Sequence, residues 1–153
     1  MINSRNSAKA IIIDNDRVLL SKKQYDDGSI TYTLPGGTQE PGESLENAVI
    51  REVYEEVAAK VSVIKLLNIY EHQRNSKKHH GDISHKIEFG FLCQLEEDYH
   101  PVMGAAPDSH QVAVEWKQID TLSKLTLSPK RLAEIIIRHI TSDANIYLGN
   151  ISQ

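Results

Sequence analysis

Hydrophobic residues near the start of the chain occur in short runs separated by polar clusters, a pattern typical of β-strands joined by turns. Residues 9–24 contain two aliphatic runs on either side of Asp14-Asn15-Asp16 and predict a β-hairpin. A third short run, residues 30–34, is followed by Pro35-Gly36-Gly37. Proline has no N–H to donate to a neighbouring strand, so strand pairing should stop here. We therefore expect exposed backbone at these glycines.

The pattern of polar and apolar residues changes after residue 43 and predicts a helix. Ser44 is a suitable N-cap, and the segment from there to about Ala59 contains good helix formers and neither Gly nor Pro. At about 100° per residue, three glutamates share one arc of this helix and four apolar residues share the opposite arc. The glutamates are Glu52, Glu55 and Glu56, and the apolar residues are Ile50, Val53, Tyr54 and Val57. We expect a two-faced central helix.

The second half of the chain alternates between strand-like and polar segments. Strands are predicted at 61–70, 87–95 and 112–116, and the period-two pattern is clearest over 87–95. The polar segment 73–82 is predicted to be a loop. A second helix is predicted to open at Ser128-Pro129, with a buried stripe formed by Leu132, Ile135, Ile136 and His139. This order of elements predicts one α/β domain over residues 1–153, with helices packed on a mixed sheet.

The composition is that of an ordinary globular domain without a strongly charged surface. Seventeen Lys and Arg against 21 Asp and Glu give a net charge of −4 with the seven histidines neutral. This balance argues against duplex nucleic acid and anionic membranes as partners. The chain has no apolar stretch of about 18 residues and no recognisable export signal. The lone Cys93 lies in an alternating apolar run, so we expect a buried thiol and a cytoplasmic protein.

The three glutamates on one arc of the central helix form a candidate metal site. Like charges three or four residues apart repel by a few tenths of a kcal/mol per pair, and a divalent cation would remove this cost. Mg²⁺ and Mn²⁺ prefer carboxylate and carbonyl oxygens as ligands, and Mg²⁺ commonly bridges to substrate phosphates. On spacing alone, a solvated acidic helix face is the favoured interpretation.

The residues around this helix form a recognisable motif. From Gly37 the chain reads Gly-Thr-Gln-Glu-Pro-Gly-Glu43, then seven residues, then Arg51-Glu52-Val53-Tyr54-Glu55-Glu56-Val57-Ala58-Ala59. This segment resembles the Nudix box of the Nudix hydrolase family, G-x5-E-x7-R-E-U-x-E-E-x-G-U with U aliphatic, at seven of nine constrained positions. The departures are Ala58, where the family has glycine, and Ala59, which is smaller than the usual aliphatic residue. The lead-in Leu34-Pro35-Gly36-Gly37, the strand ending Glu115-Trp116 and the closing helix also look like the family.

The resemblance implies a fold, a reaction and a cofactor. The fold would be a Nudix-like α/β/α sandwich with a central catalytic helix and a C-terminal helix. The reaction would be hydrolysis of a nucleoside diphosphate linked to another group, with Mg²⁺ or Mn²⁺ as cofactor and a small nucleotide or related diphosphate as partner. The implied metal ligands are the Gly36 carbonyl and the side chains of Glu52, Glu55 and Glu56. Gly36 and Gly37 would let the backbone approach the ion closely.

Other residues of the motif are assigned supporting roles by the same resemblance. Arg51 would pair with Glu43 and hold the loop against the helix. Glu115 stands where some relatives place a further metal-binding or base glutamate, although strand alternation explains an outward glutamate equally well. Glycine at position 58 would ease a left-handed exit from the helix, so Ala58 predicts either a longer helix or a strained turn.

Residues outside the motif are weaker candidates for contact with a phosphate or a base. His110, which precedes Gln111, could contact phosphate, although a loop histidine is more often simply exposed. The polar insertion could steer polyphosphate through Arg74, Lys77, Lys78, His79 and His80. A solvated loop is the favoured interpretation of that insertion. Three aromatic residues could stack a base, namely Tyr32, Tyr70 and Trp116, although a core position is expected for Trp116.

The sequence leaves two alternatives to a pyrophosphohydrolase. Ala58 motivates a non-catalytic nucleotide-binding or regulatory domain. Diphosphate-dependent isomerisation would need a nucleophile or acid that the sequence does not place. The substrate is not readable, because residues 74–77 hold neither the proline of some relatives that cleave ADP-ribose nor the tyrosine of some that cleave dinucleoside polyphosphates. A homodimer formed through residues 30–34 and the hairpin is a further expectation.

Overall fold

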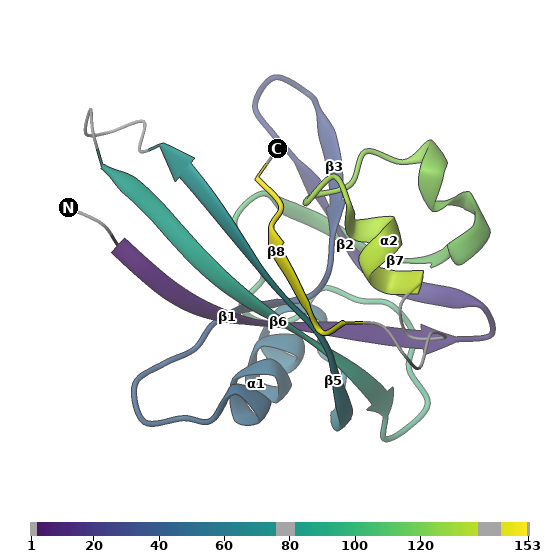
Figure 1. Ribbon diagram of the computed structural model, residues 1–153. Helices are drawn as coiled ribbons and strands as arrows, with labels where there is room; N and C mark the ends of the chain where they lie inside the picture. Colours follow the sequence, from purple (N-terminus) through teal and green to yellow (C-terminus); the bar gives the residue numbers. More distant parts are fainter. Residues whose placement is uncertain (1–2, 76–81, 138–144, 153) are drawn as a thin grey trace.

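The computed structural model describes residues 3–75, 82–137 and 145–152 (Figure 1). Strands dominate this part of the chain, and the principal helix follows the fourth strand. The elements are β1 Asn3–Asp14, β2 Arg17–Gln24, β3 Ile30–Thr33, β4 Gly36–Thr38, α1 Leu45–Val57, β5 Val61–Asn75, β6 Ile83–Leu95, β7 Gln111–Gln118, the 3-10 helix η1 Ile119–Lys124, α2 Leu132–Ile137 and β8 Tyr147–Asn150.

The strands form one mixed sheet with the order β3-β2-β1-β6-β5-β8, while β4 pairs with β1 and β7 pairs with β2. The predicted hairpin is present, with Ile13 opposite Val18 at its tip. The pairings β1–β6 and β5–β8 are parallel, and β5–β6 is a long antiparallel pair. The mixed sheet predicted from the order of elements is therefore confirmed.

Helices cover both faces of this sheet (Figure 1). Alternate residues of β1 point to opposite faces: Ala10 and Ile12 belong to the core that contains the buried side of α1, whereas Ile11 packs in a second core with residues of η1 and α2. This arrangement is the predicted α/β/α sandwich. Cys93 is buried in the first core, and burial raises the pKa of its thiol to about 12.

The prediction of exposed, unpaired backbone after Pro35 is wrong. Gly36–Thr38 forms β4, which pairs with Ser7–Lys9 of β1, and Gly36 is buried. Proline does not interrupt this pairing, because its carbonyl accepts the Ala10 N–H at 2.9 Å and its missing N–H is not needed. The glycine backbone is thereby fixed beside α1.

The predicted apolar arc of α1 is partly wrong. Ile50 and Tyr54 are exposed, whereas Val49 is buried with Val53 and Val57. The sheet therefore covers an arc rotated from the predicted one, and this rotation carries Glu56 into the interior, where its relative exposure is 4%. One of the three glutamates is thus a buried side chain and not a solvated one.

Several boundaries also differ from the predictions. β5 continues to Asn75 and β6 begins at Ile83, so most of the described part of the predicted 73–82 loop is strand. Residues 76–81 lie outside the described residues. α2 begins at Leu132 and not at Ser128, and its buried residues include Leu132, Ile135 and Ile136, while His139 lies outside the described residues. Strand β8 was not predicted at all.

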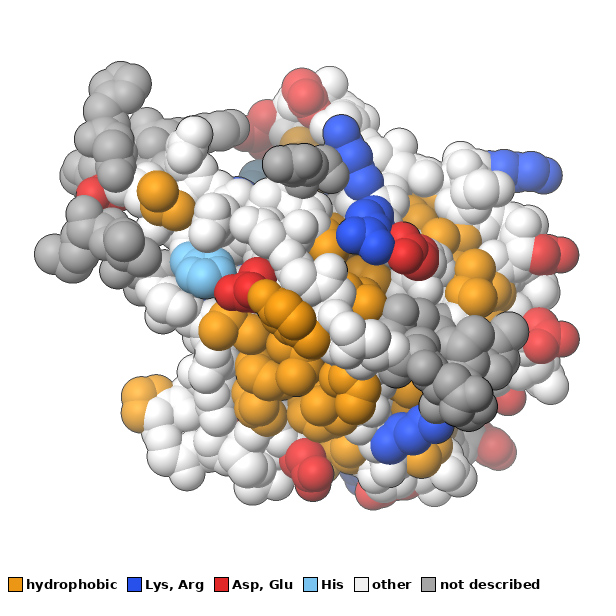
Figure 2. Space-filling view, in the orientation of Figure 1, with side chains coloured by type: hydrophobic (Ala, Val, Ile, Leu, Met, Phe, Trp, Pro, Cys, Tyr) orange, Lys and Arg blue, Asp and Glu red, His pale blue; other side chains and the backbone are white. Residues whose placement is uncertain are grey.

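Figure 2 shows hydrophobic side chains gathered near the centre of one face of the molecule, over β5 and the adjoining end of β8. The exposed large hydrophobic side chains of these two strands are Ile64 and Tyr147. Within residues 30–34, expected to supply a dimer surface, Tyr32 and Leu34 are buried, whereas Ile30 is exposed. No helix among residues 3–75, 82–137 and 145–152 is long and apolar enough to cross a membrane.

Candidate active site

Helix α1 begins at a capped N-terminus, as predicted. Ser44 has extended backbone angles, and its hydroxyl accepts the Asn47 N–H at 3.1 Å. This bond satisfies one of the free N–H groups of the first helical turn. The cap fixes where the helix starts, and thereby fixes which residues of its next two turns face the β4 backbone.

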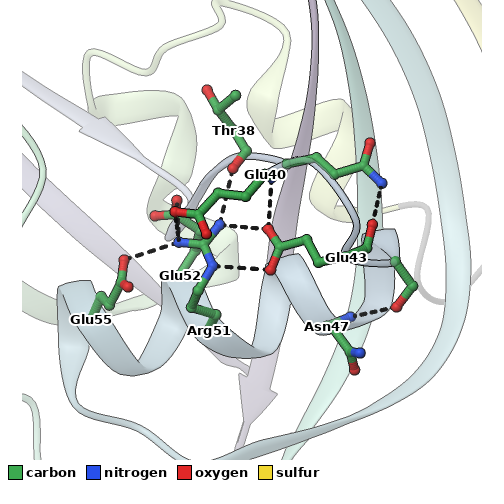
Figure 3. Close-up of polar contacts among 9 residues, drawn as sticks. Thr38, Glu40, Glu43, Asn47, Arg51, Glu52 and Glu55 are labelled. Atoms are coloured by element: carbon green, nitrogen blue, oxygen red, sulfur yellow. Dashed lines mark hydrogen bonds and ion pairs between the residues drawn. The ribbon is translucent and has the colours of Figure 1, made fainter.

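Arg51 is the centre of a hydrogen-bonded network that joins α1 to the loop before it (Figure 3). Its Nη2 and Nε contact the two carboxylate oxygens of Glu43 at 2.7 and 3.1 Å, and Nη2 also donates to the Thr38 carbonyl. Its Nη1 contacts Glu52 Oε1 at 3.0 Å and Glu55 Oε2 at 3.1 Å. The hydrogen bonds from Arg51 lower the pKa of Glu43. The fork of the guanidinium thus closes the 38–43 loop onto the helix.

The glycines of β4 place backbone directly against two glutamates of α1. The Gly36 N–H donates to Glu56 Oε2 at 3.1 Å. A Cβ atom on Gly37 would lie 2.6 Å from the Glu52 carboxylate carbon, and one on Gly36 would lie 2.2 Å from the Ala8 carbonyl oxygen. No larger residue fits at either position without a shift of the backbone or of Glu52.

Two of these carboxylates have raised pKa values in spite of the cations near them. Burial raises the pKa of Glu56 to about 7, although the nearby Lys9 ammonium and the Gly36 N–H act in the opposite direction. Burial also raises the pKa of Glu52 in spite of its contact with Arg51. A buried carboxylate is stabilised in its ionised form by a nearby cation. This pair therefore fits a bound cation.

The donor set consists of oxygen ligands that suit Mg²⁺ or Mn²⁺. Glu52 and Glu56 lie against the β4 backbone, and Glu55 is 40% exposed and is held by Arg51. Arg51 Nη1 donates to both Glu52 and Glu55. In the described part of the chain, no three acidic, histidine or cysteine side chains are grouped so as to hold a metal ion. The residues thus fit the ion chemically, and Glu55 would join the ligands by leaving Arg51.

Lys9 is a neighbour of this site that the sequence analysis missed. Its Nζ donates to the Gly36 carbonyl at 3.2 Å, and its charge acts on both Glu52 and Glu56. A signal was present in the sequence, because Lys9 is a single cation at the edge of an apolar strand run.

Ala58 ends the helix in the left-handed conformation that the family glycine would adopt. Its φ and ψ are 54° and 27°, and its N–H donates to the Tyr54 carbonyl at 3.0 Å. Of the two predicted outcomes, the strained turn is the one observed. A left-handed residue with a Cβ costs roughly 1–2 kcal/mol. The glutamates lie before this turn, so their positions do not depend on glycine.

The segment between β6 and β7 covers the C-terminal end of α1. Gly104 N–H and the Gln111 amide both donate to the Glu56 carbonyl at 2.9 Å, Ala106 N–H donates to the Glu55 carbonyl, and the Tyr99 hydroxyl donates to the Val57 carbonyl. These bonds satisfy carbonyls that have no partner within the helix. The sequence analysis did not predict this capping role, because the partners are more than forty residues apart.

Replacing Ala58 by glycine should stabilise the protein. Glycine relieves the left-handed strain, while its greater freedom in the unfolded chain offsets part of this gain. We expect the free energy of unfolding to rise by about 0.5–1 kcal/mol, measured by urea denaturation. Ala133→Gly within α2 is the matched control and should destabilise by about 1 kcal/mol. Loss of stability in Ala58→Gly would show that the alanine turn is unstrained.

Glu115 is placed apart from the helix glutamates. It lies opposite Leu20 of β2, whose side chain belongs to the α2 core, whereas the next residue, Trp116, packs against the α1 core. The carboxylate of Glu115 contacts Lys117 at 2.8 Å and the Tyr32 hydroxyl at 3.0 Å, and the bond from Lys117 lowers its pKa. Its contacts give no support to the predicted metal role.

The other candidates divide into structural and accessible residues. Gln111 is buried, and its amide donates to the Glu56 carbonyl at the end of α1. Tyr70 is 1% exposed, and Trp116 packs against the core. These contacts do not support binding of a phosphate or a base by any of the three. His110 is exposed and its ring lies 4.9 Å from that of Tyr25. Arg74 is an exposed residue of β5. Lys77, Lys78, His79 and His80 lie outside the described residues.

A cavity of about 360 Å³ opens on the α2 side of the sheet. Its walls include Tyr25, His72, Arg74, Leu127 and Ile151. This volume falls in the usual range for small-molecule sites, and the mixture of apolar and polar walls is typical of them.

Comparison with models of known protein families shows the family to which this chain belongs. The family model described as NUDIX domain matches residues 3–138. The chain belongs to the NUDIX domain family. The matched span contains every residue of the carboxylate site, including Gly36 and the Arg51 network.

Individual relatives agree with this assignment over a shorter span. A mouse protein named diphosphoinositol polyphosphate phosphohydrolase 3-alpha is 36% identical over 66 residues, which are 43% of this chain and 38% of that protein. A MutT-like protein of Streptomyces ambofaciens is 38% identical over 64 residues, or 42% of this chain and 40% of that protein. The matched segments thus span about two fifths of the curated relatives.

Solved structures resemble the fold over most of the chain. A NUDIX hydrolase from Nitrosomonas europaea has a TM-score of 0.71 at 23% identity and covers 90% of this chain and 88% of its own. An ADP-ribose pyrophosphatase from Streptococcus suis has a TM-score of 0.63 at 23% identity, with 95% and 97% coverage. These structures confirm the NUDIX fold of the chain.

Proposed function

We propose that this NUDIX domain is a Mg²⁺-dependent hydrolase that cleaves the diphosphate linkage of a nucleoside diphosphate joined to another group. The observation that carries the proposal is the buried Glu56 carboxylate, which accepts the Gly36 N–H at 3.1 Å and lies with Glu52 against the β4 backbone. The names of relatives, including phosphohydrolases and an ADP-ribose pyrophosphatase, agree with this class of reaction.

Each residue of the site has a distinct task in this proposal. Glu52, Glu55 and Glu56 would hold the cation together with the Gly36 carbonyl, which Lys9 now contacts. When bound, the cation would polarise a phosphoryl oxygen and lower the pKa of attacking water. Arg51 and Glu43 would keep the 38–43 loop on the helix and so keep Gly36 and Gly37 in place. Lys9 would turn toward substrate phosphate, because its charge is repelled by a cation at the carboxylates.

A substrate panel tests this function directly. Purified protein is incubated with nucleoside triphosphates, nucleotide sugars, ADP-ribose, dinucleotides, coenzymes and a diphosphoinositol polyphosphate, in Mg²⁺ and in EDTA. We expect release of phosphate-containing products from at least one diphosphate compound, in Mg²⁺ only. The regulatory alternative would be favoured by two results together. Wild type would bind nucleotides but hydrolyse no compound in the panel, and Ala58→Gly would restore hydrolysis.

The remaining expectations about the molecule stay predictions. The cytoplasmic location rests on the lone, buried Cys93. A homodimer is tested by analytical ultracentrifugation, and the exposed apolar region of Figure 2 is a more suitable contact surface than the buried residues of β3.

A further inference from the structure

A second, smaller cavity lies next to the carboxylate site and is lined by cations. Its volume is about 110 Å³, and its walls include Lys9, Lys23, Lys86, Arg74 and His72. The sheet brings these residues together, because β1, β6 and β5 are neighbours and His72 lies opposite Lys86 in the β5–β6 pair. Lys9 belongs to both sites, since it also donates to the Gly36 carbonyl.

Two carboxylates in the wall of this cavity are already paired. Asp108 lies 2.6 Å from Lys23, and Glu88 lies 3.1 Å from His72 Nε2. Burial disfavours ionised Glu88, yet the contact with His72 and the charge of Lys9 lower its pKa to about 2. Besides these two carboxylates, the part of the wall that the structure describes carries four Lys and Arg side chains, namely Lys9, Lys23, Lys86 and Arg74. The cavity therefore carries more positive than negative charge.

The excess of positive charge affects the pKa of Lys86. Burial lowers the pKa of its ammonium, Glu88 opposes this effect, and the charges of Lys9, Arg5 and Arg74 lower the pKa further. Long cationic side chains normally turn their charged ends to water. Here Lys9, Lys23, Lys86 and Arg74 line one small cavity, and a bound anion would reduce the repulsion among them.

The two cavities differ in size and suit different parts of one ligand. The cation-lined cavity is far smaller than the usual 300–1,000 Å³ of a complete ligand site, so it has room for a single phosphate-sized group. It shares Tyr25, His72, Arg74, Ser128 and Pro129 with the 360 Å³ cavity. A ligand can therefore extend from the carboxylates into the larger cavity while one of its groups enters the smaller one.

We propose that the cavity lined by Lys9, Lys86 and Arg74 binds a phosphate group that the substrate carries in addition to its scissile diphosphate. This inference rests on the proposed hydrolase function and narrows its substrate class. The substrate is a polyphosphorylated small molecule, and a compound whose only phosphates are the scissile pair leaves the cavity empty of negative charge.

Matched substrates test this specificity. The pairs are coenzyme A with dephospho-coenzyme A, and ADP-ribose with its 2′-phosphate. We expect kcat/KM to be at least tenfold higher for the phosphate-bearing member of at least one pair. Lys86→Met should reduce this preference by at least fivefold. Lys60→Met, at an exposed lysine 3.7 Å from Glu97, is the matched control and should retain the preference. Equal kcat/KM within both pairs overturns the inference.

A binding measurement without catalysis separates this inference from the proposed function. Inositol hexakisphosphate, which has no diphosphate bond, is titrated calorimetrically in EDTA into wild type, Lys86→Met and Arg74→Gln. We expect at least tenfold weaker binding in each variant and unchanged binding in Lys60→Met. Binding that is equal in all four proteins overturns the inference whether or not the enzyme is active. Binding that depends on Lys86 and Arg74, in a protein that hydrolyses no diphosphate, supports the cavity assignment and refutes the hydrolase function.

Discussion

Glu56→Gln should reduce kcat/KM for diphosphate hydrolysis by at least about 100-fold, which corresponds to roughly 2.7 kcal/mol of transition-state stabilisation. Glutamine preserves the size of the side chain and can keep an acceptor for the Gly36 N–H, but it removes the negative charge that would hold the cation. Steady-state assays in saturating Mg²⁺ measure the effect. Glu46→Gln, at an exposed glutamate in the first turn of the same helix, is the control and should stay within twofold of wild type.

The same substitution should change how stability depends on pH when no metal is present. The pKa of Glu56 is raised to about 7 from its ordinary value of 4.5, so the folded protein favours the protonated carboxyl. The stabilising effect of protonation is full below about pH 4.5 and is lost as the pH rises through about 7. Glutamine resembles the protonated form at every pH. Urea unfolding in EDTA should therefore show wild type losing stability relative to Glu56→Gln between pH 5 and pH 8; parallel pH profiles would contradict the assignment of Glu56 as a buried, uncompensated carboxylate.

Arg51→Met should lower the free energy of unfolding by about 3 kcal/mol, because the substitution leaves several partly buried carboxylates without their partner. Arg51 is 23% exposed and donates to Glu43, Glu52, Glu55 and the Thr38 carbonyl. For a domain of this size, the expected fall in Tm is about 6–12 °C at 2–4 °C per kcal/mol. Activity should fall as well, because the 38–43 loop would no longer be held against the helix. Differential scanning calorimetry and the steady-state assay measure the two effects.

Two comparisons define the role of Arg51 more closely. Arg131→Met removes an exposed i,i+3 ion pair with Glu134 on α2 and should change Tm little. The pKa of Glu43 is lowered by Arg51, so the stability from this pair is present above the ordinary carboxyl pKa and is lost as the pH falls through the lowered value. The difference between wild type and Arg51→Met should thus shrink on acidification. A variant that keeps its Tm but loses activity would show that Arg51 contacts substrate and is not structural.

The helix and its acidic motif could be predicted because the information is local. Ser44, the absence of Gly and Pro, and the i, i+3, i+4 spacing of the glutamates are all visible within fifteen residues, and the structure confirms the helix they predict. The burial of Glu56 was not predictable in this way. It depends on which arc of α1 meets the sheet, and that arc is fixed by long-range contacts with β1, β4 and β6.

Some positions in the site were not predicted from the sequence, because they depend on contacts between residues far apart in the chain. Gly36 looks like a loop residue locally, yet β1 pairs with it and makes it part of the sheet. Lys9, Lys86 and Arg74 are ordinary strand or loop cations along the chain, and only the sheet order places them around one cavity. Gln111 and Gly104 likewise donate hydrogen bonds to the carbonyl of Glu56, which is far from both in the sequence.

The most direct test of the central claim is calorimetric titration of Mn²⁺ and Mg²⁺ into wild type, Glu52→Gln/Glu56→Gln and Glu46→Gln. The carboxylates of α1 and the β4 backbone would hold the ion, so wild type and Glu46→Gln should bind it with the same affinity and gain thermal stability with increasing metal concentration. The double variant should lose at least tenfold in affinity and most of this gain. Equal affinity and equal stabilisation in all three proteins would contradict the assignment of this site as the metal centre of the NUDIX domain.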